Sequence, residues 1–103
     1  MSRRVVWSVD AQRDVHELVS YAADLDTDFA DRLYGELEDT AQSLAAFDTG
    51  RPGRSRGTRE KSLTKRRLIM IYRVERHRHE ELVLVLRVIH TARSRPADEL
   101  PDD

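Results

Sequence analysis

The feature that most constrains this sequence is a change in hydrophobic period near its midpoint. Up to residue 47 apolar side chains recur mostly at helical spacing, and between residues 58 and 90 they form runs typical of β-strands. At 103 residues the chain fits one domain with a single modest core. Helices and strands that are segregated along such a chain predict an α+β fold.

The first half of the chain predicts one short strand and two helices. Residues 3–7 are rich in β-branched and aromatic side chains, and Ser8 can cap a helix that should end near Asp24. Asp26 or Thr27 can begin a second helix. The apolar stripes are Ala11, Val15, Leu18, Val19 and Ala22 in the first helix, and Phe29, Leu33, Leu37, Ala41, Leu44 and Phe47 in the second. Because the connection is so short, the helices must lie antiparallel.

Two glycines bear on the second helix. Gly50, followed by Pro52, stops it. Gly35 lies within it and costs about 1 kcal/mol relative to alanine. It marks either a close contact between the two helices or a tolerated surface position.

The second half predicts three strands, at residues 58–63, 67–74 and 82–90, with a polar hairpin connection at residues 76–80. The last two strands are apolar on both alternating sets, as expected of central strands. The predicted order is β-α-α-β-β-β, with a helical hairpin packed on one face of a small, mostly antiparallel sheet and the other face open for function.

The domain is expected to span residues 1–96. Two segments look loose: residues 50–57, through glycine, proline and arginine, and residues 97–103, an acidic and flexible C-terminal tail. The first strand should pair with a later one that the sequence does not specify.

The formal net charge of −1 hides a strong separation of charge along the chain. Residues 51–95 hold 14 of the 18 Lys and Arg residues and only 4 acidic residues, whereas residues 1–50 hold 4 basic and 11 acidic residues. A folded cationic surface predicts a polyanionic or acidic partner. The alternative is a solvated surface whose charges pair with the acidic helices.

Composition excludes several classes of protein. The sequence has no cysteine, which removes disulfides, thiolate nucleophiles and cysteine-based zinc sites and favours a reducing cytoplasm. The apolar run Val5–Trp7 is too short for a secretory signal, and Leu82–Leu86 is too short to span a bilayer, so no membrane partner is expected. Because no phosphate-binding glycine loop, hydrolase triad or paired-carboxylate motif is present, we expect no cofactor and no metal.

The histidines are the first candidates for proton transfer. His16 is expected on the surface of the first helix. His77 and His79 could bind a metal as a pair, but hairpin decoration is the favoured interpretation because no third ligand accompanies them. His90 ends the strongest strand, where it is either a site residue or a cap of the sheet edge.

Cationic side chains of the second half could hold a phosphate group. These are Arg59, Lys61, Lys65, Arg67, Arg73 and Arg93. Proton transfer at such a site would need His90, Glu60 or Tyr72, although Tyr72 fits a core position better. Arg87 lies inside an apolar strand, so it either faces an open groove or pairs with an acid such as Glu60.

Several segments, in this order, resemble the RelE/ParE superfamily of toxins from bacterial type II toxin–antitoxin systems. They are Trp7-Ser8 with Ala11 and Asp14, Gly57-Thr58-Arg59-Glu60, Ile71-Tyr72-Arg73-Val74, and Leu86-Arg87-Val88-Ile89-His90 before Arg93. The resemblance covers the chain from about Val5 to Pro96. It implies the same compact fold and a cognate antitoxin with a DNA-binding domain, whose acidic tail would meet the basic segment in a hetero-oligomer.

The resemblance implies two possible mechanisms. RelE-like members cleave mRNA on the ribosome, which would here use Arg59, Lys61, Arg87, His90 and Arg93. No tyrosine follows Tyr72, however, so that pattern is incomplete. ParE-like members bind DNA gyrase and trap its cleaved complex.

We favour the ParE-like branch, with growth arrest and plasmid stabilisation as its expected consequences. An inactive binding module is a third possibility. The contact surface is expected to be the one sheet face that bears Arg59, Lys61, Arg87, His90 and Arg93. The full set of candidate partner-binding residues is Arg59, Glu60, Lys61, Arg67, Arg73, Arg87, His90 and Arg93.

Overall fold

A computed structural model describes residues 3–91 of the chain. In order, the elements are β1 (Arg4–Trp7), α1 (Val9–Leu25), α2 (Thr27–Ala46), β2 (Arg51–Pro52), β3 (Arg59–Leu63), the 3-10 helix η1 (Thr64–Arg66), β4 (Leu68–His77) and β5 (Glu80–His90). They confirm the predicted α+β class. The predicted tail at residues 97–103 and Arg93 lie outside the described residues.

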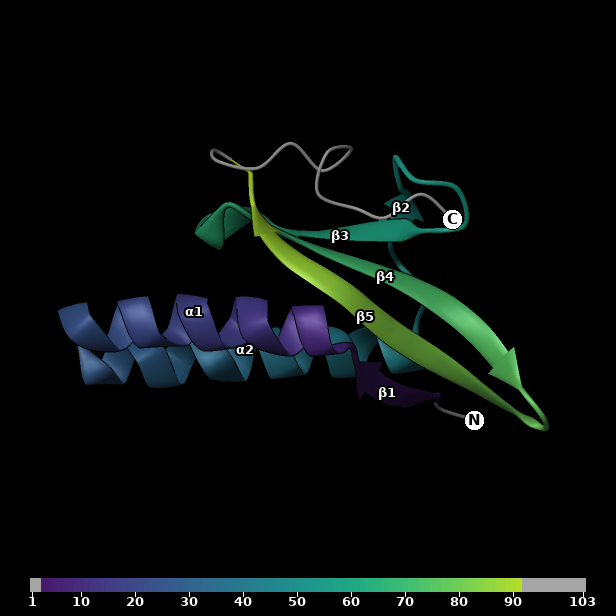
Figure 1. Ribbon diagram of the computed structural model, residues 1–103, viewed down its shortest axis with the longest axis horizontal. Coiled ribbons are helices and arrows are strands. Elements are labelled where there is room, and N and C mark those ends of the chain that lie inside the picture. The colour runs from purple at the N-terminus through teal and green to yellow at the C-terminus, as the bar shows by residue number, and fades with distance from the viewer. Residues whose placement is uncertain (1–2, 92–103) are drawn as a thin grey trace.

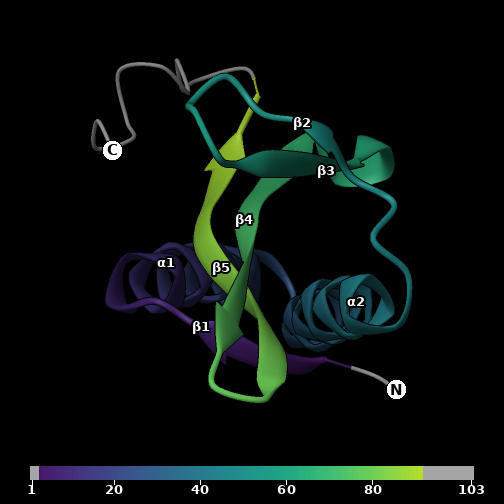
Figure 2. The same ribbon diagram turned by 90° about the vertical axis from the view of Figure 1, so that its right-hand side faces the viewer.

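The strands form one sheet in the order β1-β5-β4-β3-β2. β1 pairs in parallel with β5, and the other neighbours are antiparallel. The antiparallel helices lie together on one side of the sheet, and β2 and β3 lie at the end of the sheet farthest from β1 (Figures 1 and 2). The predicted architecture of a helical hairpin on a mostly antiparallel sheet is therefore confirmed.

The sheet has one strand more than the sequence predicted. β2 consists only of Arg51 and Pro52, which pair with Glu60 and Arg59 of β3. The expectation that residues 50–57 form a loose segment is wrong at this point. Two residues are too few to produce a period, and proline is unfavourable in a strand unless the strand lies at an edge, as this one does.

Capping residues begin both helices as predicted. The Ser8 hydroxyl accepts a hydrogen bond from the Ala11 amide (3.0 Å), and the Asp26 carboxylate accepts one from the Asp28 amide (2.8 Å). Asp26 also ends α1, so the two helices are joined at a single residue. A Cβ atom at Gly35 would have no neighbour within 4 Å, which makes it a tolerated surface position and rules out close helix packing there.

The main core lies between the helices and the sheet. Its fully buried members include Leu37 and Leu44 of α2, Met70 and Tyr72 of β4, and Val85 of β5. Ile71 and Ile89 form a second, smaller apolar cluster with partly buried neighbours. The central position of β4 and β5 explains why both strands are apolar on both alternating sets.

No helix within residues 3–91 has the length and apolar character required to cross a membrane.

Candidate partner-binding surface

The chain turns from β1 into α1 beside the middle of β5. The Ser8 amide donates to the Val85 carbonyl (2.9 Å), and the Ser8 hydroxyl donates to the Leu86 carbonyl (2.9 Å). A register shift between β4 and β5 at the same level leaves Leu86 outside the pairing. Ser8 therefore caps the helix and also provides hydrogen-bond donors for two β5 carbonyls at the point where β1 ends.

Asp14, further along α1, makes the next contacts between this helix and β5. Its carboxylate accepts hydrogen bonds from Arg87 Nε (2.7 Å), Arg87 Nη2 (3.1 Å) and the Val88 amide (2.9 Å). The side chains of Arg87 and Asp14 are only 19% and 14% exposed. Arg87 thus pairs with an acid, as one of the two sequence interpretations had it, but the suggested partner, Glu60, was wrong.

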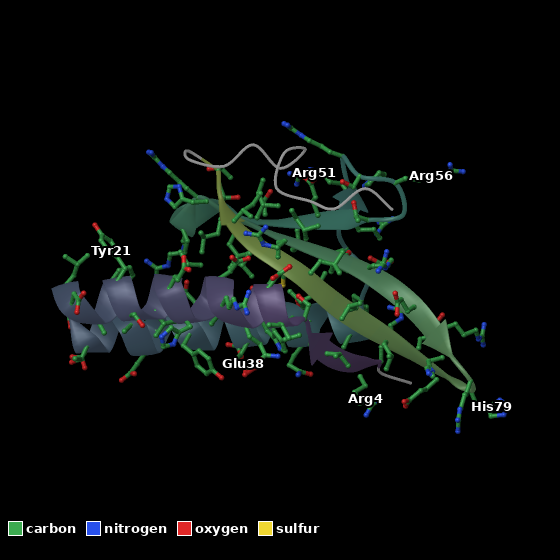
Figure 3. All side chains as sticks on the ribbon, in the orientation of Figure 1. Arg4, Tyr21, Glu38, Arg51, Arg56 and His79 are labelled. Carbon is green, nitrogen blue, oxygen red and sulfur yellow. The ribbon has the colours of Figure 1, made fainter. Side chains whose placement is uncertain are left out.

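A cleft of about 360 Å³ lies between α1 and the end of β5. Arg87 and His90 contribute to it from the strand, and Asp14, Glu17 and Tyr21 contribute to it from the helix. Tyr21 is 62% exposed and projects from the upper side of α1 in the view of Figure 3. Sequence reasoning missed Tyr21, because nothing in the helical period shows which strand a given helix face will meet.

The charges of this cleft are poorly suited to a phosphate group. Asp14 and Glu17 supply two carboxylates, and the Arg87 guanidinium is held by one of them. A phosphodiester entering here would meet like charges before it met an available cation. A larger groove of about 450 Å³ lies between the helices, and none of the predicted site residues lines it.

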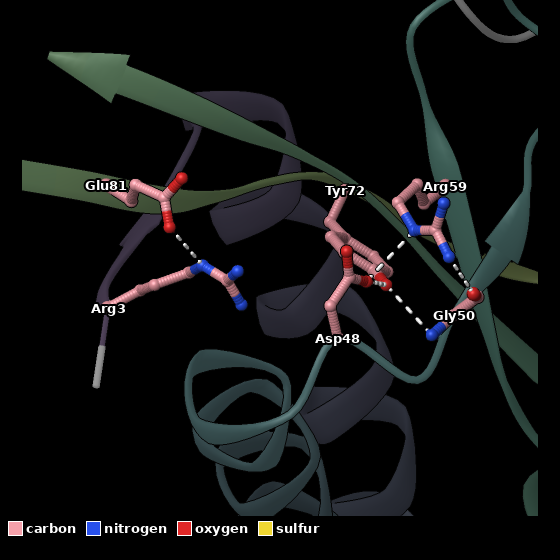
Figure 4. Close-up of polar contacts among 6 residues, drawn as sticks. All are labelled: Arg3, Asp48, Gly50, Arg59, Tyr72 and Glu81. Carbon is pink, nitrogen blue, oxygen red and sulfur yellow. Dashed lines mark hydrogen bonds and ion pairs between the residues drawn. The ribbon is translucent and has the colours of Figure 1, made fainter. Parts of the chain in front are cut away.

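Arg59 is held by the segment that connects α2 to β2 (Figure 4). Its Nε donates to Asp48 Oδ1 (2.9 Å), and its Nη2 donates to the Gly50 carbonyl. The buried Tyr72 hydroxyl donates to the same Asp48 oxygen (2.5 Å) and accepts a hydrogen bond from the Gly50 amide (3.0 Å). A Cβ atom at residue 50 would lie 2.1 Å from that hydroxyl, so only glycine fits.

This network changes the proton affinities of its members. Burial, followed by the hydrogen bond to Asp48, raises the pKa of Tyr72 above its usual value. The neighbouring Tyr72 and Asp48 side chains raise the pKa of Arg59. Tyr72 is therefore a protonated core residue at neutral pH, as the sequence suggested. The Arg59 guanidinium binds the segment that connects α2 to β2 and is not available to an external ligand.

The turn between β2 and β3 is held by its own side chains. The Thr58 hydroxyl donates to the Ser55 carbonyl (2.6 Å), and Gly57 has a φ of 79°, which favours glycine. Glu60 is buried, accepting a hydrogen bond from the Arg54 amide (3.2 Å) and lying 3.4 Å from Arg51 Nη2. Glu60 thus fixes the turn from inside, and its carboxylate is not available to an external partner.

The predicted cluster does not lie on one face. Arg59 and Lys61 are paired with Tyr72 and Met70, so they share the face that the helices cover. Glu60 and Arg73 lie on the opposite face, because each alternates with one of those residues along its strand. Arg73 forms an ion pair with Glu75 (2.9 Å). The prediction of a single cationic face is therefore wrong, and partner binding by these residues stays a prediction.

A different set of cations is available at the β2–β3 end of the sheet. These side chains have neither an ion pair nor a side-chain hydrogen bond within residues 3–91, and we call them the edge cations. They are Arg54, Arg56, Lys61, Lys65 and Arg67. Only Lys61 and Arg67 were among the predicted partner-binding residues.

Metal binding finds no support in the side-chain positions. Within residues 3–91, no group of three or more His, Asp or Glu side chains could hold an ion, and His77 and His79 lie at the exposed tip of the β4–β5 hairpin.

The sequence matches the family model described as the ParE toxin of the type II toxin–antitoxin system parDE, over residues 5–95. The chain belongs to the ParE toxin family. It is also 34% identical over 98 residues to Y4kP of Sinorhizobium fredii, a protein named as a candidate toxin, with 93% of this chain and 97% of that one covered.

Solved structures support the family's fold. A toxin–antitoxin ParDE structure from P. aeruginosa has a TM-score of 0.74 at 17% identity, covering 86% of this chain and 96% of that one. The toxin–antitoxin complex RelBE2 from Mycobacterium tuberculosis has a TM-score of 0.63 at 22% identity, covering 87% and 99%. This ParE-family toxin therefore has the fold common to both branches of the superfamily, and the predicted superfamily is confirmed.

The motifs that carried the resemblance are now explained as structural residues. Ser8 and Asp14 join α1 to β5, and Gly57, Thr58 and Glu60 shape the turn before β3. Tyr72 holds the connection after α2. These residues specify the fold. The edge cations lie between or next to them along the sequence.

Proposed function

We propose that this ParE-family toxin arrests growth by binding DNA gyrase and trapping its cleaved DNA complex. The family match supports this branch, since poisoning of gyrase is what resemblance to ParE implies. The observation that carries the choice is the acidic cleft between α1 and β5, in which the Arg87 guanidinium is bonded to Asp14. A gyrase inhibitor needs a shaped contact surface and no acid–base pair. An acidic cleft without an available guanidinium is therefore compatible with gyrase inhibition.

The second candidate is ribosome-dependent cleavage of mRNA. One observation favours it: Tyr21 and His90 line the same cleft, which would supply the aromatic hydroxyl that the sequence lacks after Tyr72. Proton transfer by such groups contributes about 10²- to 10⁴-fold to a rate. Against it stands the charge of the cleft, because two carboxylates would oppose binding of the RNA backbone.

We further propose that a cognate antitoxin neutralises the toxin in a hetero-oligomer within the cytoplasm. The two structural neighbours come from toxin–antitoxin systems, which supports a partner of this kind. The antitoxin's acidic tail would cover the basic half of the sheet and block its other contacts. A toxin that is retained only as a binding module would also keep this partner.

Two assays with the purified full-length protein separate these candidates. Under the gyrase proposal the protein inhibits supercoiling and causes linear DNA to accumulate after detergent and protease treatment, while coupled translation is unaffected. Under the ribonuclease alternative, translation stops, supercoiling is unaffected, and His90→Ala restores translation. A protein that is inert in both assays but binds its antitoxin would be a binding module and would contradict the gyrase proposal.

A further inference from the structure

We infer that the edge cations form a contact surface for the phosphate backbone of duplex DNA. The inference goes beyond the proposed function, because it assigns the toxin a direct contact with DNA in addition to its contact with gyrase. It rests on the proposed function only in that the DNA in the cell would be the segment held by gyrase.

The first argument is the availability of charge. Within residues 3–91 several other arginines in or beside the sheet are held by carboxylates: Arg3 by Glu81, Arg59 by Asp48, Arg66 by Glu36, Arg73 by Glu75 and Arg87 by Asp14. The five edge cations have no such partner. Three carboxylates near this end of the sheet are already bonded: Glu60 is buried and accepts from the Arg54 amide, Asp48 accepts from Arg59, and Glu36 is paired with Arg66. External phosphates would therefore meet cations without displacing an internal acid.

The second argument is the arrangement of these cations. Arg54 and Arg56 lie on the turn before β3, and Lys65 and Arg67 lie just after it. Lys61 lies between them in the chain but on the helix-covered face of β3, so the two outer pairs make the principal contacts. Five residues of strand extend about 17 Å. The two groups can therefore reach phosphates several nucleotides apart along a duplex. The turn is fixed by Thr58 and Glu60, so little ordering of the backbone is needed on binding.

The third argument is that this edge is closed to an extended peptide. Strand addition requires a row of free amide and carbonyl groups. β2 is only two residues long and one of them is Pro52, which has no amide hydrogen. An acidic chain could not extend the sheet beyond β2, whereas phosphates need only the side chains.

The fourth argument is the separation of charge in the folded molecule. Four acidic residues, Asp24, Asp26, Asp28 and Asp31, lie around the junction of the two helices. This junction is at the far end of the helical hairpin from the sheet (Figure 1). Arg51 and Arg56 lie on the side of the sheet that faces away from the helices (Figure 3). The field of the molecule therefore orients the β2–β3 end towards a polyanion, although the net charge is −1.

Arg67 and Arg78 provide a matched pair of variants. They are the two described non-glycine residues with positive φ, at 55° and 58°. Arg67 precedes β4 among the edge cations, and Arg78 follows β4 at the hairpin tip. Substitution by glycine at either position removes one charge and relieves the same backbone strain, so both variants should raise the Tm. Only Arg67→Gly should weaken DNA binding.

The experiment measures binding of a fluorescent 30-base-pair duplex by anisotropy at several salt concentrations. Each phosphate contact contributes about −0.9 to the slope of log K against log salt. We expect a slope of about −3 to −4 for the wild type, a loss of about one unit with Arg67→Gly, and a loss of about two with Arg54→Gln/Arg56→Gln. At 150 mM salt these losses correspond to about 5-fold and about 30-fold weaker binding.

Three results would overturn the inference. Equal loss of binding by Arg78→Gly and Arg67→Gly would mean that only the overall charge matters. Duplex binding by Arg54→Gln/Arg56→Gln as tight as that of the wild type would show that the β2–β3 end makes no phosphate contact. Absence of duplex binding by the wild type at 50 mM salt would remove the DNA contact and leave the gyrase proposal untouched, because the supercoiling assay does not depend on it.

Discussion

The arginine at the junction of α1 with β5 and the arginines at the β2–β3 end of the sheet have opposite roles, although all of them belong to the same basic half of the sequence. At the junction, Arg87 is bonded to Asp14 and shielded from solvent. At the β2–β3 end, Arg54 and Arg56 are exposed and have no ion pair within residues 3–91. The comparison teaches that charge density identifies a basic half of the chain, but topology decides which cations hold the fold and which can meet a partner.

The largest expected effect tests the junction. Asp14→Ala removes three hydrogen bonds and leaves the Val88 amide and the Arg87 guanidinium without this acceptor. We expect a loss of about 2–4 kcal/mol in the free energy of unfolding, measured by urea denaturation. Asp10→Ala, whose carboxylate is exposed on the same helix, should cost no more than about 1 kcal/mol. Equal losses in both variants would show that the contacts of Asp14 with β5 do not stabilise the fold.

The same geometry shows why charge reversal at Arg87 is a poor test of partner binding. A carboxylate placed at residue 87 would face Asp14 in a partly buried site, so loss of activity would report loss of the fold.

A second test concerns the network that fastens Arg59. Tyr72→Phe removes the hydroxyl that Asp48 and Gly50 both contact, and should cost about 1–2 kcal/mol. Because the folded state raises the pKa of Tyr72, its contribution is complete below the ordinary value of about 10 and decreases as the pH rises above it. Urea denaturation between pH 8 and 11 should show a smaller alkaline decrease for the variant. Tyr21→Phe, at an exposed side chain of α1, should behave as the wild type.

A third test concerns Arg66, which is held to α2 by both oxygens of Glu36 at 2.7 Å. Glu36 is 44% exposed, so Glu36→Gln should cost only about 0.5–1 kcal/mol. The hydrogen bond from Arg66 lowers the pKa of Glu36. Its contribution is therefore present above the ordinary carboxyl pKa of about 4.3 and is lost as the pH falls through the lowered value. Unfolding curves from pH 6 to 3 should show a reduced acid slope in the variant; an unchanged slope would contradict this contact.

The smallest expected effect tests the other side of the comparison. Arg54→Gln/Arg56→Gln should change the free energy of unfolding by no more than about 0.5 kcal/mol, because neither guanidinium has an ion-pair partner within residues 3–91. The same variant should lose growth arrest in cells. A large loss of stability in this variant would place Arg54 and Arg56 with the structural arginines and remove the contrast.

Much of the fold could be predicted because its signals are local. Ser8 and Asp26 cap the helices, the apolar stripes repeat at helical spacing, and β4 and β5 are apolar on both sets of side chains. The site could not be predicted in the same way. The contacts of Asp14 with Arg87 span 73 positions of sequence, and no local pattern records which carboxylate a distant guanidinium will meet.

The two-residue strand β2 and the Asp48 network were missed for the same reason. Asp48 follows α2 in what reads as a loop, and its function depends on Tyr72, which is 24 positions away. The resemblance to a toxin family was carried by residues that turned out to build the structure, so it identified the fold more reliably than the contact surface.

The most direct test of the central claim is a gyrase cleavage assay that compares three purified proteins: the wild type, Arg78→Gly and Arg54→Gln/Arg56→Gln. We predict that the wild type and Arg78→Gly cause equal accumulation of linear DNA, and that the double variant, still folded by circular dichroism, causes much less. No linear DNA with the wild type would contradict gyrase poisoning, and equal accumulation with all three proteins would contradict the role of the β2–β3 end.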